Sequence, residues 1–153
     1  MDNFTLFRTN SDDLNFRSLV ALLDKDLAIR DGEDHAFYAQ YNTVDAIKEV
    51  VVALNDKGKA VGCGAFKPFD ENSVEIKRMF VHPDFRKRGI AALILNELEI
   101  WSASISYGRC VLETGKKQPE AIALYLKSGY LLIPNYGQYI GIDNSVCFEK
   151  ILK

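Results

Sequence analysis

Long apolar runs are missing from this 153-residue sequence: no stretch approaches the roughly 18 consecutive apolar residues that a membrane-spanning helix needs. The longest runs, IAALIL and VVVAL, have the length of buried core segments. The N-terminus, MDNFTLFRTNSDD, lacks the basic start, apolar stretch and small-residue cleavage site of an export signal. With 48% hydrophobic and 26% charged residues the composition is that of a globular protein, so we expect a cytoplasmic protein with no membrane partner.

Histidine and cysteine are scarce. His35 and His82 are the two histidines, which leaves little material for a histidine-based metal cluster or a Ser-His-Asp arrangement. The three cysteines, Cys63, Cys110 and Cys147, are far apart and lack the close pairs that zinc and redox sites use. We therefore expect no metal site and three buried thiols.

The sequence also has little excess charge of either sign. Nineteen basic and twenty-one acidic side chains give a formal net charge of −2. Because non-specific affinity for phosphate backbones depends on a positive surface, this balance argues against a nucleic-acid partner. A local basic patch is compatible with it.

The apolar pattern alternates between strand-like and helix-like segments, without a repeat or a linker. Apolar residues recur at helical spacing between residues 16 and 27, after polar capping candidates, and Gly32 ends that helix. Two β-rich runs flank NDKGK, where Gly58 suits a hairpin turn. Residues 33–45 show no clean period, which fits a short helix or a loop, and they are expected as a loop. The remaining predicted elements are strands at 4–8, 73–82, 109–115, 131–134 and 144–152, and helices near 90–106 and 119–128.

This order, β-α-β-β-β-α-β-α-β-β, predicts an α/β (mixed α+β) fold with one central mixed sheet and helices packed on it. The length suits one domain with a core, and we expect residues 1–153 to form it.

The stretch RKRGIA, residues 86–91, places three cations and a glycine at the start of a predicted helix. A helix start carries about half a positive charge and unpaired amides, so it favours anions and disfavours neighbouring cations. Gly89 leaves the backbone open to a phosphate. The alternative is a solvated loop. Neither the P-loop nor the dinucleotide-binding pattern is present, so the phosphate ligand would be another one.

Two motifs resemble the GNAT superfamily of acetyl-CoA-dependent N-acetyltransferases. VEIKRMFVHPDFRKRGIAALIL, residues 74–95, is similar to motif A, in which a strand and a turn precede a helix that opens with Arg/Gln-x-x-Gly-x-Gly/Ala. VLETGKKQPEAIALYLKSGY, residues 111–130, is similar to motif B. The resemblance implies a mostly antiparallel sheet that splays between its fourth and fifth strands. It also implies an enzyme that uses acetyl-CoA as co-substrate and no metal.

The resemblance further implies a set of coenzyme A contacts. The pyrophosphate would lie on the amides of the helix start, and the pantetheine arm would bind the end of the preceding strand. Gln118 replaces an asparagine common in the family, which leaves that contact open. The implied cofactor-binding residues are Met79, Phe80, Val81, Arg86, Lys87, Arg88, Gly89, Ile90, Ala91, Gln118 and Tyr125.

Two residues carry the implied catalysis. Tyr125 occupies the motif B tyrosine that can protonate the departing thiolate, although its spacing also suits a core aromatic. Glu75 lies where some members carry a general base that takes a proton from the amine. Its alternative role is a structural salt bridge with Lys77. Both interpretations of each residue stay open.

The expected reaction is direct transfer of an acetyl group to a primary amine of a small molecule or peptide, without an acyl-enzyme. Acidic and aromatic residues suggest an acceptor pocket, with solvated loops as the alternative: Asp31, Glu33, Asp34, Tyr38, Tyr41, Tyr136 and Tyr139. A non-catalytic acyl-CoA-binding or regulatory module is the main alternative function. Family members often form dimers, so a homodimer is expected by analogy alone, and the oligomeric state stays open.

Overall fold

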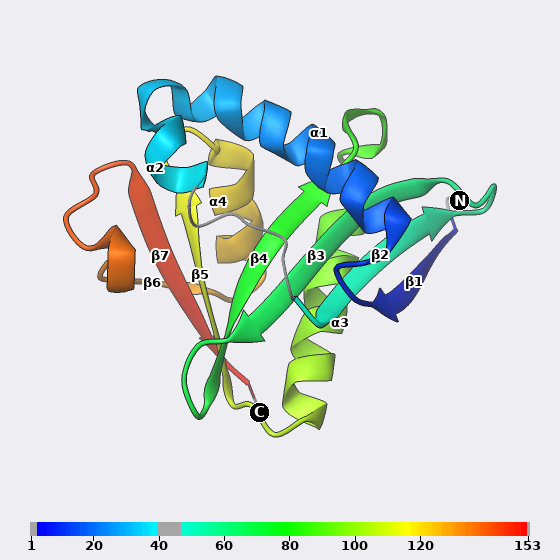
Figure 1. The fold of residues 1–153 in the computed structure, drawn as a ribbon. Coiled ribbons are helices and arrows are strands. Elements are labelled where there is room, and N and C mark those ends of the chain that lie inside the picture. Colours follow the sequence, from blue (N-terminus) through cyan, green and yellow to red (C-terminus); the bar gives the residue numbers. More distant parts are fainter. Residues whose placement is uncertain (1–2, 40–46, 153) are drawn as a thin grey trace.

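The protein folds as one seven-stranded sheet with helices on both faces (Figure 1). The computed structural model describes residues 3–39 and 47–152. Its strands are β1 (Phe4–Thr9), β2 (Glu49–Asn55), β3 (Ala60–Pro68), β4 (Ser73–Val81), β5 (Arg109–Gly115), β6 (Leu131–Ile133) and β7 (Ser145–Ile151). Its α-helices are α1 (Leu14–Asp31), α2 (His35–Ala39), α3 (Ile90–Ser104) and α4 (Pro119–Lys127).

The strand order is β1-β2-β3-β4-β5-β7-β6, and every neighbouring pair except β4–β5 is antiparallel. The parallel pair is short: residues 73–75 of β4 face residues 109–111 of β5. Beyond Glu75, β4 pairs only with β3, while β5 pairs with β7 along its whole length. The predicted mixed, mostly antiparallel sheet and its splay between β4 and β5 are confirmed.

The two faces of the sheet pack against different helices. Successive residues of β2 alternate between them, because a strand turns its side chains to opposite faces. Val50 and Val52 join the cluster under α1, whereas Val51 and Ala53 join the one under α3 and α4. Figure 1 shows α1 crossing one face and α3 running behind the other. Beyond residue 75 of β4 and residue 111 of β5 these two strands no longer pair, so the sheet is open between them.

Helix α1 follows its predicted pattern closely. Asp13 caps it by accepting a hydrogen bond from the Phe16 amide at 2.9 Å. Phe16, Leu19 and Val20 are buried on the sheet, and the helix ends at Gly32 with a φ of 55°. The segment after it was expected as a loop, but residues 35–39 form α2. The rest of that expected loop lies outside the described residues. None of the described helices meets the length and apolarity required to cross a membrane.

Candidate functional site: a cavity at the fork of the sheet

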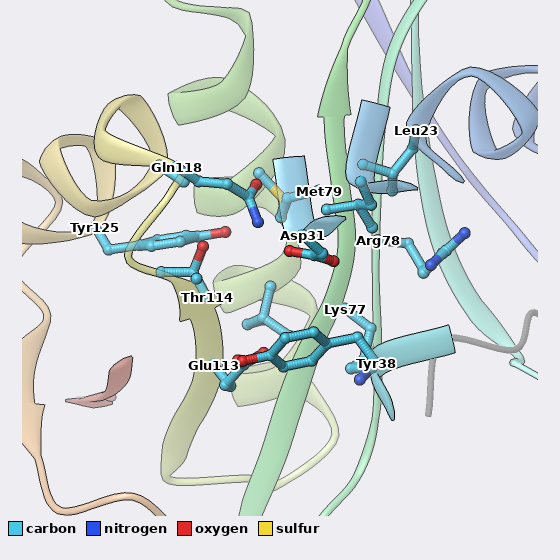
Figure 2. A pocket seen from close by; sticks show the side chains of 14 residues that line it. Leu23, Asp31, Tyr38, Lys77, Arg78, Met79, Glu113, Thr114, Gln118 and Tyr125 are labelled. Atoms are coloured by element: carbon cyan, nitrogen blue, oxygen red, sulfur yellow. The ribbon is translucent and has the colours of Figure 1, made fainter. Parts of the chain in front are cut away.

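A cavity of about 90 Å³ opens where β4 and β5 separate (Figure 2). Two strands that part leave backbone and side-chain groups without a neighbouring strand, so a fork is a natural place for a ligand. The cavity is lined by residues from α1, α2, β4, β5 and α4: Leu23, Leu27, Asp31, Tyr38, Ile76, Lys77, Arg78, Met79, Glu113, Thr114, Gly115, Gln118, Ala121 and Tyr125.

A bulge in β4 shapes one wall of this cavity. Arg78 has a φ of 59°, and the register between β3 and β4 shifts between Cys63 and Ala65. One extra residue in a strand reverses the alternation of the side chains that follow. Ile76 before the bulge and Val81 after it therefore lie in the same core cluster, although they are an odd number of residues apart.

Two consecutive charged residues at the bulge, Lys77 and Arg78, take different directions. The Arg78 guanidinium donates to Asp24 of α1 at 2.5 Å and points away from Glu113 and Asp31 (Figure 2). Lys77 instead lies in the cavity, 9% exposed. Within the described residues, its ammonium has neither a hydrogen bond nor an ion pair, and burial lowers its pKa.

Two carboxylates face the same space from opposite sides. Burial raises the pKa of Glu113, on β5, to about 7 against an ordinary value of 4.5, and the negative charges of Asp31 and Glu75 add to that rise. A hydrogen bond with Ser145 and the charge of Lys77 act the other way. In the described part of the chain, Glu113 Oε2 is fully buried and bonds to nothing. Asp31, at the end of α1, is 3% exposed, and burial raises its pKa as well.

The other end of the cavity is formed mainly by α4 and the end of β5. Figure 2 shows the Tyr125 hydroxyl, the Gln118 amide and Thr114 near one another there, with Met79 behind them. Tyr125 is 6% exposed, and its ring lies edge-on to Tyr130, with centroids 5.8 Å apart. Burial raises the pKa of Tyr125 above its usual range, so its hydroxyl keeps its proton at neutral pH.

The start of α3 keeps its backbone amides available. Gly89 caps the helix with a φ of 81°, and a Cβ added there would meet no atom within 4 Å. Among the described residues, the amides of Gly89, Ile90 and Ala91 donate to no other group. The Arg86 Nε donates to the Val81 carbonyl oxygen at 2.9 Å, which ties the turn to the end of β4. The open helix start expected from RKRGIA is therefore present, with amides of the kind that bind anions elsewhere.

The structure gathers only some of the expected site residues around the cavity. Met79, Gln118 and Tyr125 line it, as do Asp31 and Tyr38 of the expected acceptor residues. Phe80 and Val81 lie in the two core clusters, and Glu33 is exposed. Tyr41 lies outside the described residues. Residues 86–91 form the turn and helix start rather than the cavity wall.

Glu75 lies in the closed part of the sheet and does not line the cavity. It accepts a hydrogen bond from the Tyr136 hydroxyl at 2.7 Å. Its ion-pair partner is Lys67, at 3.8 Å, in place of the Lys77 that the sequence suggested. Because Tyr136 also packs edge-on against Phe69 at 4.9 Å, this contact fixes the loop before β7 to the β3–β4 turn.

Sequence reasoning missed Glu113 and Lys77. Each is a charged residue inside an apolar strand, in VLETG and VEIKRMFV, and that was the available signal. No group of three or more metal-ligating side chains occurs in the part of the chain that the structure describes.

A sheet that forks beside an open helix start defines a class of folds suited to a ligand with an anionic group, and comparison with known proteins identifies the family. The model of the Acetyltransferase (GNAT) family matches residues 16–130, and the chain belongs to this family. It is similar to an IAA acetyltransferase of Azospirillum brasilense, with 36% identity over 62% of the chain. The match covers 63% of the length of that relative.

Two solved structures share the fold over nearly the whole chain. One is assigned as an acyl-CoA N-acyltransferase of Klebsiella pneumoniae, with a TM-score of 0.83 and 27% identity over 98% of each chain. The other is a GNAT family acetyltransferase of Elizabethkingia anophelis with acetyl-CoA bound. It has a TM-score of 0.72 and 19% identity, and the match covers 99% of this chain and 100% of that one.

Proposed function

We propose that this protein transfers an acetyl group from acetyl-CoA to a primary amine by direct attack of the amine. The observation that carries the proposal is the pairing, in one cavity, of a carboxylate with a pKa of about 7, Glu113, and a buried tyrosine hydroxyl, Tyr125. The matched region and the flanking strands share one sheet, so we also propose that residues 1–153 act as a single domain.

Acetyl-CoA fits the residues present. The free amides at the start of α3 would hold the pyrophosphate, and Arg86, Lys87 and Arg88 supply positive charge around it. One edge of β4 pairs with β3. The other edge, which has no strand partner beyond Glu75, would hold the pantetheine arm near Met79 and Gln118. Acetyl-CoA supplies the acetyl group as a thioester, whose carbon–sulfur bond breaks as the new carbon–nitrogen bond forms.

Glu113 acts as the general base. An amine arrives mostly as an ammonium ion and must lose a proton before its lone pair can attack. A carboxylate with a pKa of about 7 is half ionised at neutral pH, and it holds the received proton better than an ordinary glutamate does. This assignment replaces Glu75, whose Tyr136 and Lys67 contacts give it a positioning role for the loop before β7.

Tyr125 acts as the general acid. The departing thiolate needs a proton, and the Tyr125 hydroxyl is protonated at neutral pH because burial raises its pKa. The attacking nitrogen is positively charged once its bond to the acetyl carbon has formed, and it loses the second proton to give the neutral amide, which restores the tyrosine. Of the two protons that leave the amine nitrogen, one therefore ends on the thiol and the other reaches solvent through Glu113.

The test is to mix the protein with acetyl-CoA and a panel of primary amines while free thiol is measured. We expect thiol release that depends on both acetyl-CoA and the amine. Stabilisation of the protein by acetyl-CoA without thiol release on any amine would favour the non-catalytic acyl-CoA-binding module. Absence of any stabilisation by acetyl-CoA would refute the cofactor site itself.

A further inference from the structure

The cavity contains a largely buried cation, Lys77, on which the negative charges of Glu75 and Glu113 act without forming an ion pair among the described residues. Lys77 is 9% exposed and lines the cavity, and within the described residues its ammonium makes no hydrogen bond or ion pair. Leaving a buried charge unpaired costs free energy unless something else satisfies it. The acetyl transfer proposed above gives Lys77 no task. Its position instead suggests that a ligand anion pairs with it.

Two carboxylates that line the cavity, Glu113 and Asp31, define a second subsite, and the charge of Asp31 acts on Glu113. Figure 2 shows Asp31 between the Tyr125 end of the cavity and the end where Glu113, Tyr38 and Lys77 lie. Glu113 and Asp31 attract an ammonium ion, which Lys77 repels. One small cavity thus offers a place for a positive group and a place for a negative group.

We propose that the acceptor is a small amino acid, whose amine lies at Glu113 and Asp31 while its carboxylate binds Lys77. The inference rests on the proposed acetyl transfer and names its substrate class. Bound in this way, the amino acid pairs the Lys77 ammonium and places its amine beside the proposed base, Glu113.

Size and charge argue against other amines. A cavity of about 90 Å³ is small, so it suits the adjacent amino and carboxyl groups of an α- or β-amino acid. The second cation of a diamine would meet Lys77. A phosphate dianion would meet the negative charges of Asp31 and Glu113, which a single ammonium does not outweigh.

The first experiment compares pairs of acceptors that differ only in the carboxylate: alanine with alaninamide, and β-alanine with β-alaninamide. We expect kcat/KM for each acid to exceed that for its amide by about tenfold or more, the size of a charge-assisted hydrogen bond. Alaninamide and β-alaninamide have less basic amines than the corresponding acids. A larger fraction of their amine is therefore neutral at pH 7, so the protonation state of the amine alone would favour the two amides. Equal use of acid and amide would overturn the proposal and leave acetyl transfer standing.

The second experiment removes the cation. Lys77→Met removes the ammonium and keeps an unbranched side chain one atom shorter. For this variant kcat/KM for alanine should fall about tenfold to hundredfold, while that for alaninamide changes less than about threefold. Lys67→Met is the matched control, since Lys67 lies on β3 outside the cavity and its side chain is 47% exposed. It should leave the preference for the acid unchanged. A preference that survives Lys77→Met would contradict the assignment of the carboxylate subsite.

A binding measurement separates this inference from the proposed function. In the presence of coenzyme A, calorimetry should show tighter binding of N-acetylalanine than of N-acetylalaninamide to the wild type, with the difference lost in Lys77→Met. That result without thiol release would support the ligand class and refute the reaction. Equal binding of the two compounds to the wild type would overturn the ligand class, and this comparison needs no variant to fold.

Discussion

Changing Glu113 to glutamine removes the proposed base while keeping its shape. A positioned general base typically contributes about 10²- to 10⁴-fold to the rate, so we expect kcat to fall by that amount. The wild-type kcat/KM should fall below pH 7 as Glu113 takes up a proton, and the Glu113→Gln variant should lose this limb. Burial raises this pKa most, and Ser145, Lys77, Asp31 and Glu75 modify it, so the limb reports on the cavity as a whole.

The same substitution should stabilise the fold at high pH. One pKa unit corresponds to 1.36 kcal/mol, so raising the pKa of Glu113 from 4.5 to about 7 is worth about 3 kcal/mol. Below pH 4.5 both the folded and the unfolded wild type carry the proton, and the variant gains nothing. Between pH 4.5 and pH 7 Glu113 ionises in the unfolded chain but stays protonated in the folded one, so the wild type loses stability relative to the Glu113→Gln variant. Above pH 7 the difference in the free energy of unfolding stays constant.

Urea denaturation at pH 4.5 and pH 8 measures this difference, and initial rates of thiol release measure the pH dependence of activity. Glu75→Gln is the control, because its amide oxygen can still accept the Tyr136 hydrogen bond and Glu75 does not line the cavity. The reasoning is refuted if Glu75→Gln abolishes the acidic limb while Glu113→Gln keeps it, or if the stability gained by Glu113→Gln is the same at both pH values.

Three further changes test separate parts of the site and fold. Tyr125→Phe should lower kcat by about 10²-fold or more with little change in the affinity for acetyl-CoA, and an unchanged kcat in steady-state assays would remove Tyr125 from the mechanism. Gly89→Ala and Gly58→Ala impose the same backbone strain, at φ values of 81° and 79°, and each should cost about 1 kcal/mol by thermal unfolding. Only Gly89→Ala should raise KM for acetyl-CoA. A rise in KM for both variants would contradict a pyrophosphate site at the start of α3. Gly64→Ala should cost about 1–3 kcal/mol in urea denaturation, because its Cβ would lie 2.5 Å from Met79 Sδ, and a stabilising effect would contradict this packing.

Local patterns in the sequence were enough to predict most elements and the α3 start. The helical spacing of Phe16, Leu19 and Val20 depends on neighbours within a few turns, and so does the open backbone at Gly89. The fork between β4 and β5 followed from the resemblance of two motifs rather than from propensity. Helix α2 has only five residues, too few for its apolar residues to show a helical spacing.

The interior of the site depends on contacts that no local pattern contains. Glu75 meets Tyr136 across 61 residues, so its role was visible only after folding. The bulge at Arg78 has no sequence signature, since a positive φ is uncommon for any residue other than glycine. Burial by neighbouring elements sets the pKa of Glu113, and its sequence context, VLETG, shows only an isolated acid in a strand.

The central claim is that this chain moves an acetyl group from a thioester to an amine. The most direct test uses acetyl-CoA labelled with ¹³C in the acetyl carbonyl and follows the label by NMR during incubation with alanine. The account predicts that the label appears in the amide of N-acetylalanine, one for each thiol released. Label that remains in acetyl-CoA with every amine, or that appears only in free acetate, would contradict it.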